Sequence, residues 1–243
     1  LRGLELTLQD GDFVTVIGGN GAGKSTMLNA IAGVWPVDMG KILVDGQDIT
    51  RLPEHKRAQY IGRVFQDPMM GTAATMQIDE NLALAARRGA KRTLRIGITK
   101  KEHDEYYELL KTLDLGLENR MTSKVGLLSG GQRQAVTLLM ATLKRPKLLL
   151  LDEHTAALDP KTAAKVLELS QKIVSENHLT TLMITHNMKD AIKYGNRLIM
   201  MHEGHIIYDV RGEEKANLQV SDLLQRFEQV SGGSLDNDRM LLS

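Results

Sequence analysis

The chain has 243 residues, of which 42% are hydrophobic and 25% charged, a composition typical of a globular protein with one or two domains. A chain of this length buries enough surface to fold without disulfides or a structural metal, and it contains no cysteine. Its 31 Lys and Arg against 30 Asp and Glu give a formal net charge of +1, which argues against a protein that binds nucleic acid through bulk positive charge.

Short aliphatic runs alternate with helical patterns along the chain, which predicts an α/β protein with a largely parallel central sheet. The predicted strands are residues 13–17, 41–44, 63–65, 148–152 and 181–185, followed by a hairpin of 197–201 and 205–209 that turns at Glu203-Gly204. The helix after the first strand has an apolar face made of Met27, Leu28, Ile31 and Val34.

A glycine-rich segment lies between the first strand and that helix and fits the pattern G-x-x-x-x-G-K-[ST]: Gly18, Gly19, Asn20, Gly21, Ala22, Gly23, Lys24 and Ser25. Glycines let successive backbone N–H groups point into one concavity, and the helix start adds its positive end. Lys24 would place a charge on the β- and γ-phosphates, and Ser25 a hydroxyl on Mg²⁺. The pattern, extended by Thr26, predicts a nucleoside triphosphate site; the alternative is a glycine-rich turn that binds nothing.

The strand signal disappears between residues 68 and 128, where amphipathic segments near 78–88 and 101–113 predict helices. We expect a helical subdomain over about 68–145, inserted in the core, and a short C-terminal helix and tail over about 215–243. The helical segment carries a basic stretch formed by Arg87, Arg88, Lys91, Arg92, Arg95, Lys100 and Lys101. A solvated loop is the favoured interpretation of this stretch, and contact with a partner or with anionic headgroups is the alternative.

A second candidate anion site precedes a helix that is predicted to run to about residue 144. Ser129 is placed as the N-cap of this helix, and two glycines, Gly130 and Gly131, follow it before Gln132. Such a helix start binds anions without a lysine. A capped helix without a ligand is the alternative.

Two acids follow four aliphatic residues at 148–151, where a buried strand is predicted to emerge at its carboxyl end. Asp152 fits a Mg²⁺ ligand, usually acting through water, and Glu153 fits the general base that polarises the attacking water. A strand that ends in a solvated acidic turn is the alternative, which the phosphate loop in the same chain disfavours.

The sequence L-S-G-G-Q, with Ser129 lying 23 residues before Asp152, resembles the signature motif of ATP-binding cassette (ABC) ATPases. The resemblance implies a P-loop NTPase fold with a mostly parallel central sheet, an antiparallel β subdomain and an inserted helical subdomain, all in one domain over 1–243. In this family the signature of one subunit closes over the γ-phosphate bound by the other. The resemblance therefore implies a head-to-tail homodimer that sandwiches two ATP molecules, each with Mg²⁺.

Three further positions match the family one by one. Gln66, in F-Q-D-P, matches the glutamine loop that reaches Mg²⁺ and the attacking water. Asp159, in A-L-D, matches the loop that crosses the dimer interface, and a helix N-cap before Pro160 is compatible with that role. His186, in I-T-H, matches the switch histidine of the γ-phosphate. Ordinary surface positions are the alternative for Gln66 and His186, and no residue ahead of the loop matches the family's adenine-stacking aromatic side chain.

No apolar run approaches the length of a membrane span, and the first residues lack the features of a signal peptide, so we expect a cytoplasmic chain. Because it begins at Leu1, we also expect its start to be missing. The resemblance implies an ATPase peripheral to the inner face of the cell membrane, which energises transport through an integral-membrane permease. The absence of a fused membrane segment favours an importer, and the similarity to amino-acid-type ATPases implies an amino acid or similar small solute delivered by an extracytoplasmic substrate-binding protein.

Two alternatives remain open. The first is a non-transport ABC ATPase, which the near-neutral charge and the lack of coiled coils disfavour. The second is a nucleotide-dependent interaction module with negligible turnover. A degenerate cassette of that kind is expected to lack the base or the signature, and this sequence carries both Glu153 and L-S-G-G-Q.

Overall fold

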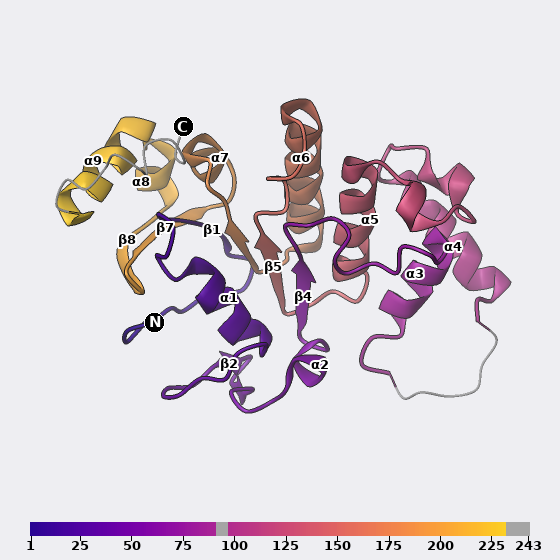
Figure 1. The fold of residues 1–243 in the computed structure, drawn as a ribbon, viewed down its shortest axis with the longest axis horizontal. Coiled ribbons are helices and arrows are strands. Elements are labelled where there is room, and N and C mark those ends of the chain that lie inside the picture. The colour runs from indigo at the N-terminus through magenta and orange to yellow at the C-terminus, as the bar shows by residue number, and fades with distance from the viewer. Residues whose placement is uncertain (91–96, 232–243) are drawn as a thin grey trace.

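The structure, a computed structural model, describes residues 1–90 and 97–231 (Figure 1). Its central sheet has the strand order β4-β5-β6-β1-β7-β8, in which β8 alone runs antiparallel to its neighbour. The strands are β1 (Phe13–Ile17), β4 (Ile61–Val64), β5 (Leu148–Asp152), β6 (Thr181–Ile184), β7 (Arg197–His202) and β8 (His205–Arg211). The predicted parallel sheet and the predicted final hairpin are confirmed.

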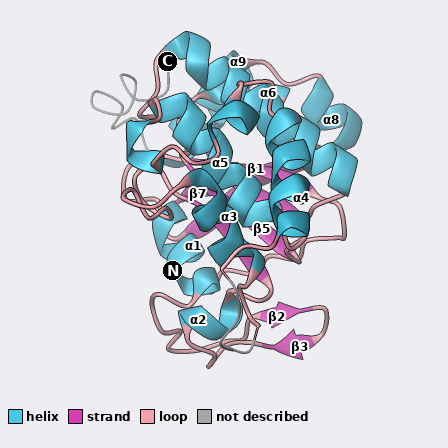
Figure 2. Ribbon diagram, turned by 90° about the vertical axis from the view of Figure 1, so that its right-hand side faces the viewer, coloured by secondary structure: helices cyan, strands magenta, loops and turns pink. Residues whose placement is uncertain are grey.

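Helices flank the sheet, and a small antiparallel ladder lies apart from it (Figure 2). The ladder joins β2 (Leu43–Val44) and β3 (Gln47–Asp48). The helices are α1 (Lys24–Ala32), α2 (Glu54–Arg57), α3 (Ile78–Ala86), α4 (Lys100–Lys111), α5 (Gly130–Thr142), α6 (Pro160–Asn177), α7 (Met188–Lys193), α8 (Gly212–Ala216) and α9 (Val220–Ser231), with 3₁₀ turns at Leu117–Arg120 and Val125–Leu127. Within the described ranges, no helix has both the length and the apolar character needed to span a bilayer.

The two faces of the sheet are covered by different helices. Leu150 of β5 belongs to the same buried apolar cluster as Leu28 of α1. Its neighbour Leu151 belongs to the cluster that includes Leu138 of α5 and Leu167 of α6. Because side chains alternate along a strand, α1 covers one face of the sheet, and α5 and α6 cover the other. The helix behind the glycine-rich loop and the helix behind Ser129 therefore pack on opposite faces.

The inserted helices surround an apolar cluster of their own. Its buried members include Ile78, Leu82, Leu110, Leu117 and Val125. Helix α5 contributes Val136 and Leu139 to this cluster, whereas Leu138 and Ala141 of the same helix pack against the sheet. The helix after Ser129 thus packs against both the inserted helices and the central sheet.

Helix α1 ends earlier than its apolar pattern predicts. Gly33 is its C-cap at a φ of 85°, which terminates the helix after Ala32. Val34 consequently lies beyond the helix and is 43% exposed, so its assignment to the apolar face of this helix is wrong. A Cβ atom at Gly33 would lie 2.8 Å from Nε of Arg57, which gives this glycine a packing role as well.

Two arginines of the basic stretch make hydrogen bonds within the chain. Arg87 donates to the carbonyl oxygen of Gly97 over 2.6 Å and forms an ion pair with Glu102 at 3.1 Å. Arg88 donates to the carbonyl oxygen of Ala141 over 3.1 Å, and burial lowers its pKa. The solvated-loop interpretation is wrong for Arg88, whereas Arg87 stays partly exposed. Lys100 and Lys101 are exposed. Outside the described residues lie Lys91, Arg92 and Arg95 of the stretch and positions 232–243 of the predicted tail.

An ion pair between a buried arginine and an exposed aspartate joins the last two strands. Arg197 of β7 faces Asp209 of β8, with Nε at 2.8 Å from Oδ1 and Nη2 at 2.5 Å from Oδ2. Its Nη1 donates to the carbonyl oxygen of Thr7 over 2.7 Å. The hydrogen bonds from Arg197 hold the pKa of Asp209 below its usual range. This arginine attaches the N-terminal segment to the edge of the sheet.

Arg57 is buried, with 2% of its surface exposed, and its guanidinium donates to four backbone carbonyl oxygens. The acceptors are Leu52 at 2.8 Å, Thr50 at 2.7 Å, Ala30 at 2.6 Å and Ile31 at 2.8 Å. Two of these carbonyls belong to the end of α1, where a positive charge stabilises a helix. Arg57 therefore fastens α1 to the segment that follows the small ladder.

Replacing the Arg57 side chain tests its contribution to the stability of the fold. Arg57→Met removes the donors and leaves buried carbonyl oxygens without partners, so we expect the free energy of unfolding to fall by about 2–4 kcal/mol. Urea unfolding followed by circular dichroism measures this change. The matched control Arg51→Met alters an exposed arginine and should change stability by less than about 0.5 kcal/mol. Equal effects of the two substitutions would contradict the role of Arg57.

Candidate functional site

Four neighbouring strands end at one edge of the sheet. β4, β5, β6 and β1 are parallel and adjacent, with Asp152 opposite Ile184 and Ile184 opposite Val16 in the register. The segments that follow these strands carry Gln66, Glu153, His186 and the glycine-rich loop. Residues far apart in the sequence are thereby brought to the carboxyl edge, where ligands bind in open α/β sheets.

The glycine-rich loop adopts backbone conformations that require glycine. Gly18, Gly21 and Gly23 have φ values of 151°, 77° and 100°. A Cβ atom at Gly18 would lie 2.3 Å from the carbonyl oxygen of Met201, so a larger residue does not fit. Gly23 is the N-cap of α1, which points the first N–H groups of that helix at the loop.

Lys24 lies inside the loop and is 5% exposed. Its Nζ donates to the carbonyl oxygens of Gly18 at 2.5 Å and Gly19 at 3.1 Å. The next residue, Ser25, is exposed, and Thr26 is half-buried. A cation inside the loop and a hydroxyl at its surface are thus adjacent on the first turn of α1.

Glu153 and His186 form a pair between adjacent strands. The carboxylate Oε1 of Glu153 lies 2.6 Å from Nε2 of His186. Glu153 has a φ of 47°, an uncommon conformation for a residue with a side chain, and its N–H donates to the carbonyl oxygen of Ile184 over 3.1 Å. Backbone conformations of this kind concentrate at functional sites, where surrounding contacts hold them.

Asp152 is paired with a residue that the sequence analysis did not single out. Nη2 of Arg63, on β4, lies 2.9 Å from Oδ2 of Asp152. The guanidinium of Arg63 also lies over the ring of Phe65, 4.7 Å from its centre. Its place in the predicted strand 63–65 was visible in the sequence, but the pairing of that strand with β5, which carries Asp152, was not.

His154, next to Glu153, is a second residue that the sequence patterns did not identify. It is buried, with 1% exposed, and its Nε2 lies 2.9 Å from Oγ of Ser170 on α6. Because the Ser170 hydroxyl donates to the carbonyl oxygen of Val166, the imidazole is the donor to Ser170. Burial lowers the pKa of His154 to about 4. This neutral histidine connects the turn after Glu153 to α6. No spacing pattern in the sequence predicts this contact.

Ser129 caps α5 with the expected geometry. Its Oγ accepts a hydrogen bond from the N–H of Gln132 at 3.3 Å, and the Gln132 side-chain oxygen accepts one from the N–H of Ser129 at 3.2 Å. Ser129 and Gly130 are exposed. A Cβ atom at Gly131 would lie 2.2 Å from Cγ2 of Thr162, so this glycine is needed for the packing of α5 on α6.

Asp159 is the N-cap of α6, the structural role that its position before Pro160 predicted. Its Oδ1 accepts a hydrogen bond from the N–H of Thr162 at 3.1 Å. Hydrogen bonds from Thr162 hold the pKa of Asp159 below its usual range. Because Thr162 also packs against Gly131, the loop of Asp159 adjoins the start of α5.

Gln66 is exposed immediately after Phe65, whose carbonyl oxygen is anchored to α5. Nε2 of the fully buried Gln134 donates to that oxygen over 3.0 Å. The segment of Gln66 and the helix that begins after Ser129 are therefore fixed to one another within the chain.

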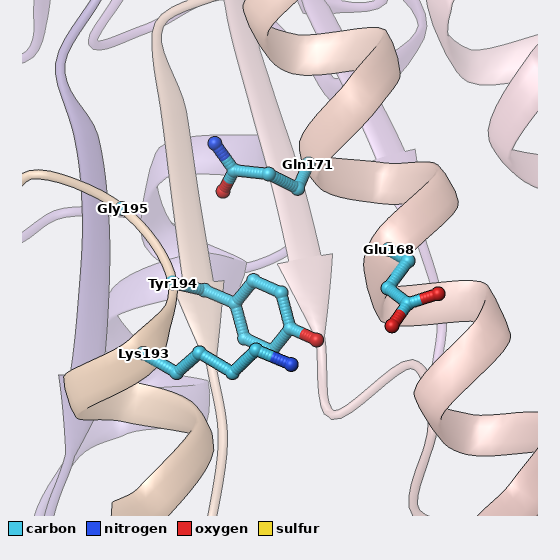
Figure 3. A pocket seen from close by; sticks show the side chains of 5 residues that line it. All are labelled: Glu168, Gln171, Lys193, Tyr194 and Gly195. Atoms are coloured by element: carbon cyan, nitrogen blue, oxygen red, sulfur yellow. The ribbon is translucent and has the colours of Figure 1, made fainter.

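A hollow of about 440 Å³ lies between α6 and the segment after α7 (Figure 3). It is lined by Glu168, Gln171, Lys193, Tyr194 and Gly195. Gly195 packs against the carbonyl oxygen of Phe13, the first residue of β1, whereas the glycine-rich loop follows the last residue of that strand. The hollow therefore belongs to the opposite edge of the sheet from the site built above.

The family model described as "ABC transporter" matches residues 1–156. The tyrosine transport ATP-binding protein of Clostridioides difficile (strain R20291) is 49% identical over 229 residues, which cover 93% of this chain and 89% of that protein. The methionine import ATP-binding protein MetN 2 of Enterococcus faecalis (strain ATCC 700802 / V583) is 34% identical over 94% of this chain, and the chain spans only 64% of that longer relative.

Solved structures of ATP-binding cassettes share the fold. The dimeric post-hydrolysis state of the cassette MJ0796, bound to ADP and Pi, matches with a TM-score of 0.73 and 29% identity, covering 87% of this chain and 90% of that one. The ADP conformation of MJ1267 matches with a TM-score of 0.75 and 28% identity, covering 91% and 89%.

The family match covers more than half of the chain, and the relative from C. difficile aligns over nearly all of it. The geometry agrees, since the glycine-rich loop and the acids Asp152 and Glu153 meet at the carboxyl edge of a parallel sheet. The chain therefore belongs to the ABC transporter family, in which it is an ATPase subunit.

Proposed function

We propose that this subunit binds ATP with Mg²⁺, hydrolyses it, and so energises the import of an amino acid or a similar small solute through a separate permease. The observation that carries the proposal is the meeting of the loop around Lys24, Asp152 and the Glu153–His186 pair at one edge of the sheet. The tyrosine and methionine transport named for two relatives supports the amino-acid class of solute.

The phosphates would bind to the glycine-rich loop. Its residues Gly18 to Thr26 offer successive N–H groups, the positive end of α1 and the ammonium of Lys24. An ammonium that now donates to two loop carbonyls can turn to a phosphate oxygen without leaving the loop. Charge-assisted contacts of this kind are the strong ones in nucleotide binding.

The oxygen donors near the loop fit Mg²⁺. Ser25 offers a hydroxyl, Asp152 a carboxylate and Gln66 an amide oxygen, all hard ligands that this ion prefers. The described part of the chain contains no cluster of three or more His, Cys, Asp and Glu side chains that could cage a metal. A Mg²⁺ ion held here by few protein ligands would share phosphate oxygens and water, which is its usual habit at nucleotide sites.

Glu153 is the general base of this proposal. Its carboxylate, 11% exposed and fixed by His186, is placed to accept a proton from the water that attacks the γ-phosphate. His186 is 30% exposed, so its ring can contact Glu153 and a phosphate oxygen together. Positioning and charge stabilisation then supply most of the rate enhancement, because phosphoryl transfer asks for little covalent chemistry from the protein.

A second subunit would complete each site. Helix α1 and helix α5 cover opposite faces of the sheet, and Ser129 and Gly130 are exposed at the start of α5. We propose that Ser129, Gly130, Gly131 and Gln132 close over the γ-phosphate of the other subunit in a head-to-tail homodimer, with Asp159 at the interface. The dimeric cassette MJ0796 supports this arrangement.

Residues 1–243 would form a single ATPase domain in which the segment 68–145 meets the permease. That segment exposes the large apolar side chains of Met69, Met70 and Leu127. Arg133 joins the segment of Met69 to the segment before Leu127, since its guanidinium contacts the sulfur of Met69 and donates to the carbonyl oxygen of Gly126 at 3.0 Å. An apolar surface of this kind suits a protein partner. The subunit would then lie at the inner face of the cell membrane, and a substrate-binding protein would act from the other side through the permease.

Lys24→Ala tests the phosphate loop. Losing a charge-assisted contact of about 3 kcal/mol should weaken ADP binding by roughly 100-fold in calorimetric titration. Lys172→Ala, at an exposed position on α6, is the matched control and should bind as the wild type does. Unchanged affinity of the Lys24 variant would refute the loop as the phosphate site.

Glu153→Gln keeps the shape of the side chain and removes the base. We expect ATP hydrolysis to fall by roughly 10²–10⁴-fold while ATP still binds. The ATP-bound dimer should accumulate and be visible by size-exclusion chromatography with ATP and Mg²⁺. Glu176→Gln, on the exposed side of α6, should leave both properties unchanged. Wild-type turnover in the Glu153 variant would remove this residue from the mechanism.

Mixing two inactive variants tests whether each site is shared. Lys24→Ala lacks the phosphate charge, and Ser129→Arg places bulk where the γ-phosphate approaches α5, so each homodimer should be inactive. A heterodimer of the two retains one intact site and should regain ATPase activity. A chain with both substitutions, paired with wild type, has one lesion in each site and should stay inactive. Inactive mixed dimers, once their formation is demonstrated, would count against the shared site.

A further inference from the structure

Arg63 lies on the strand next to the proposed metal ligand. In the register of β4 and β5, Arg63 is opposite Leu150, two residues before Asp152. Because side chains alternate, Arg63, Leu150 and Asp152 project from the same face of the sheet. The side chains of Arg63 and Asp152 are only 13% and 16% exposed, and their nitrogen and oxygen are 2.9 Å apart. The pair is therefore largely removed from water, unlike a surface salt bridge.

The surroundings of this guanidinium differ from those of Arg57. Arg57 is held by four carbonyl oxygens, whereas Nε of Arg63 is buried and has no hydrogen-bond acceptor among the described residues. Its guanidinium also lies over the face of the Phe65 ring, 4.7 Å from the ring centre. A desolvated cation with so few acceptors acts strongly on the carboxylate that it does contact.

Arg63 also adjoins the segment of a second proposed metal ligand. Phe65, on which the guanidinium stacks, directly precedes Gln66 and is anchored to α5 through its carbonyl oxygen. One cation thus contacts Asp152 and the residue before Gln66. A divalent ion that binds between these two ligands meets the positive charge of Arg63 beside it.

We propose that Arg63 is a positioning residue that weakens and tunes Mg²⁺ binding by holding Oδ2 of Asp152 and neutralising its charge. The inference rests on the proposed function, in which Asp152 is a Mg²⁺ ligand. The Mg²⁺ ion would bind the carboxylate of Asp152, whose charge Arg63 already partly neutralises. Mg²⁺ and its nucleotide would therefore dissociate more readily than from a carboxylate without a cationic partner.

The test measures Mg²⁺ binding without turnover. ADP affinity is determined by calorimetric titration in EDTA and at a series of free Mg²⁺ concentrations, which gives the half-saturating Mg²⁺ concentration. Arg63→Met and Arg63→Gln remove the charge and should lower this concentration roughly tenfold, as expected for losing a neighbouring cation at a partly buried site. Arg63→Lys keeps the charge and should stay within about threefold of wild type. Arg120→Met, at an exposed position, controls for charge loss elsewhere and should match wild type.

Each outcome decides a separate point. An unchanged or higher half-saturating Mg²⁺ concentration in the folded neutral variants would overturn the role of Arg63. Asp152→Asn should abolish most of the Mg²⁺ effect on ADP affinity; if it does not, the proposed metal site is wrong and the inference falls with it. Failure of the wild type to bind ADP would contradict the proposed function itself.

Discussion

The site depends on the parallel pairing of β4, β5, β6 and β1. Parallel neighbours require long crossover connections, so the residues at their carboxyl ends are distant in sequence and adjacent in space. β5 is buried on both faces by different helices, which fixes the strand that presents Asp152 and Glu153. The hydrogen bond from the Glu153 N–H to β6 and the pair with His186 then set the direction of the carboxylate. A displaced strand would separate Glu153, Asp152 and the glycine-rich loop, which we propose as the base, the metal ligand and the phosphate site.

Helix α5 is the second organising element because it belongs to two apolar clusters. Its Gln134 holds the start of the glutamine loop, and Gly131 at its first turn packs against Thr162 behind Asp159. The L-S-G-G-Q segment, the segment of Gln66 and the loop of Asp159 are thus attached to the same helix. Any tilt of α5 relative to the sheet changes the position of all three with respect to α1 and the glycine-rich loop. In the proposed function, such a tilt couples the inserted helices to the chemistry.

The sequence predicted what local patterns encode. The aliphatic run of β5 indicated a buried strand of the parallel sheet, the glycine-rich pattern indicated the turn between β1 and α1, and the S-G-G start of α5 indicated its cap. Long-range register is not visible in either strand alone, so the contact of Arg63 with Asp152 could not be anticipated. His154 needed Ser170 from another element to become a satisfied buried group. Arg88 looked solvated because its charge, and not the carbonyl oxygen within its reach, was visible in the sequence.

The hydrogen bonds between Arg57 and its four carbonyl oxygens determine how this part of the fold responds to acid. None of them titrates, so the junction between α1 and the small ladder keeps its hydrogen bonds as protons are added. The Arg197–Asp209 pair behaves differently. Asp209 has a lowered pKa in the folded chain, so its stabilising contribution is present above the unfolded-state pKa and is lost as the pH falls through the folded value. Acid should therefore loosen the β7–β8 edge before it loosens the end of α1 that Arg57 holds.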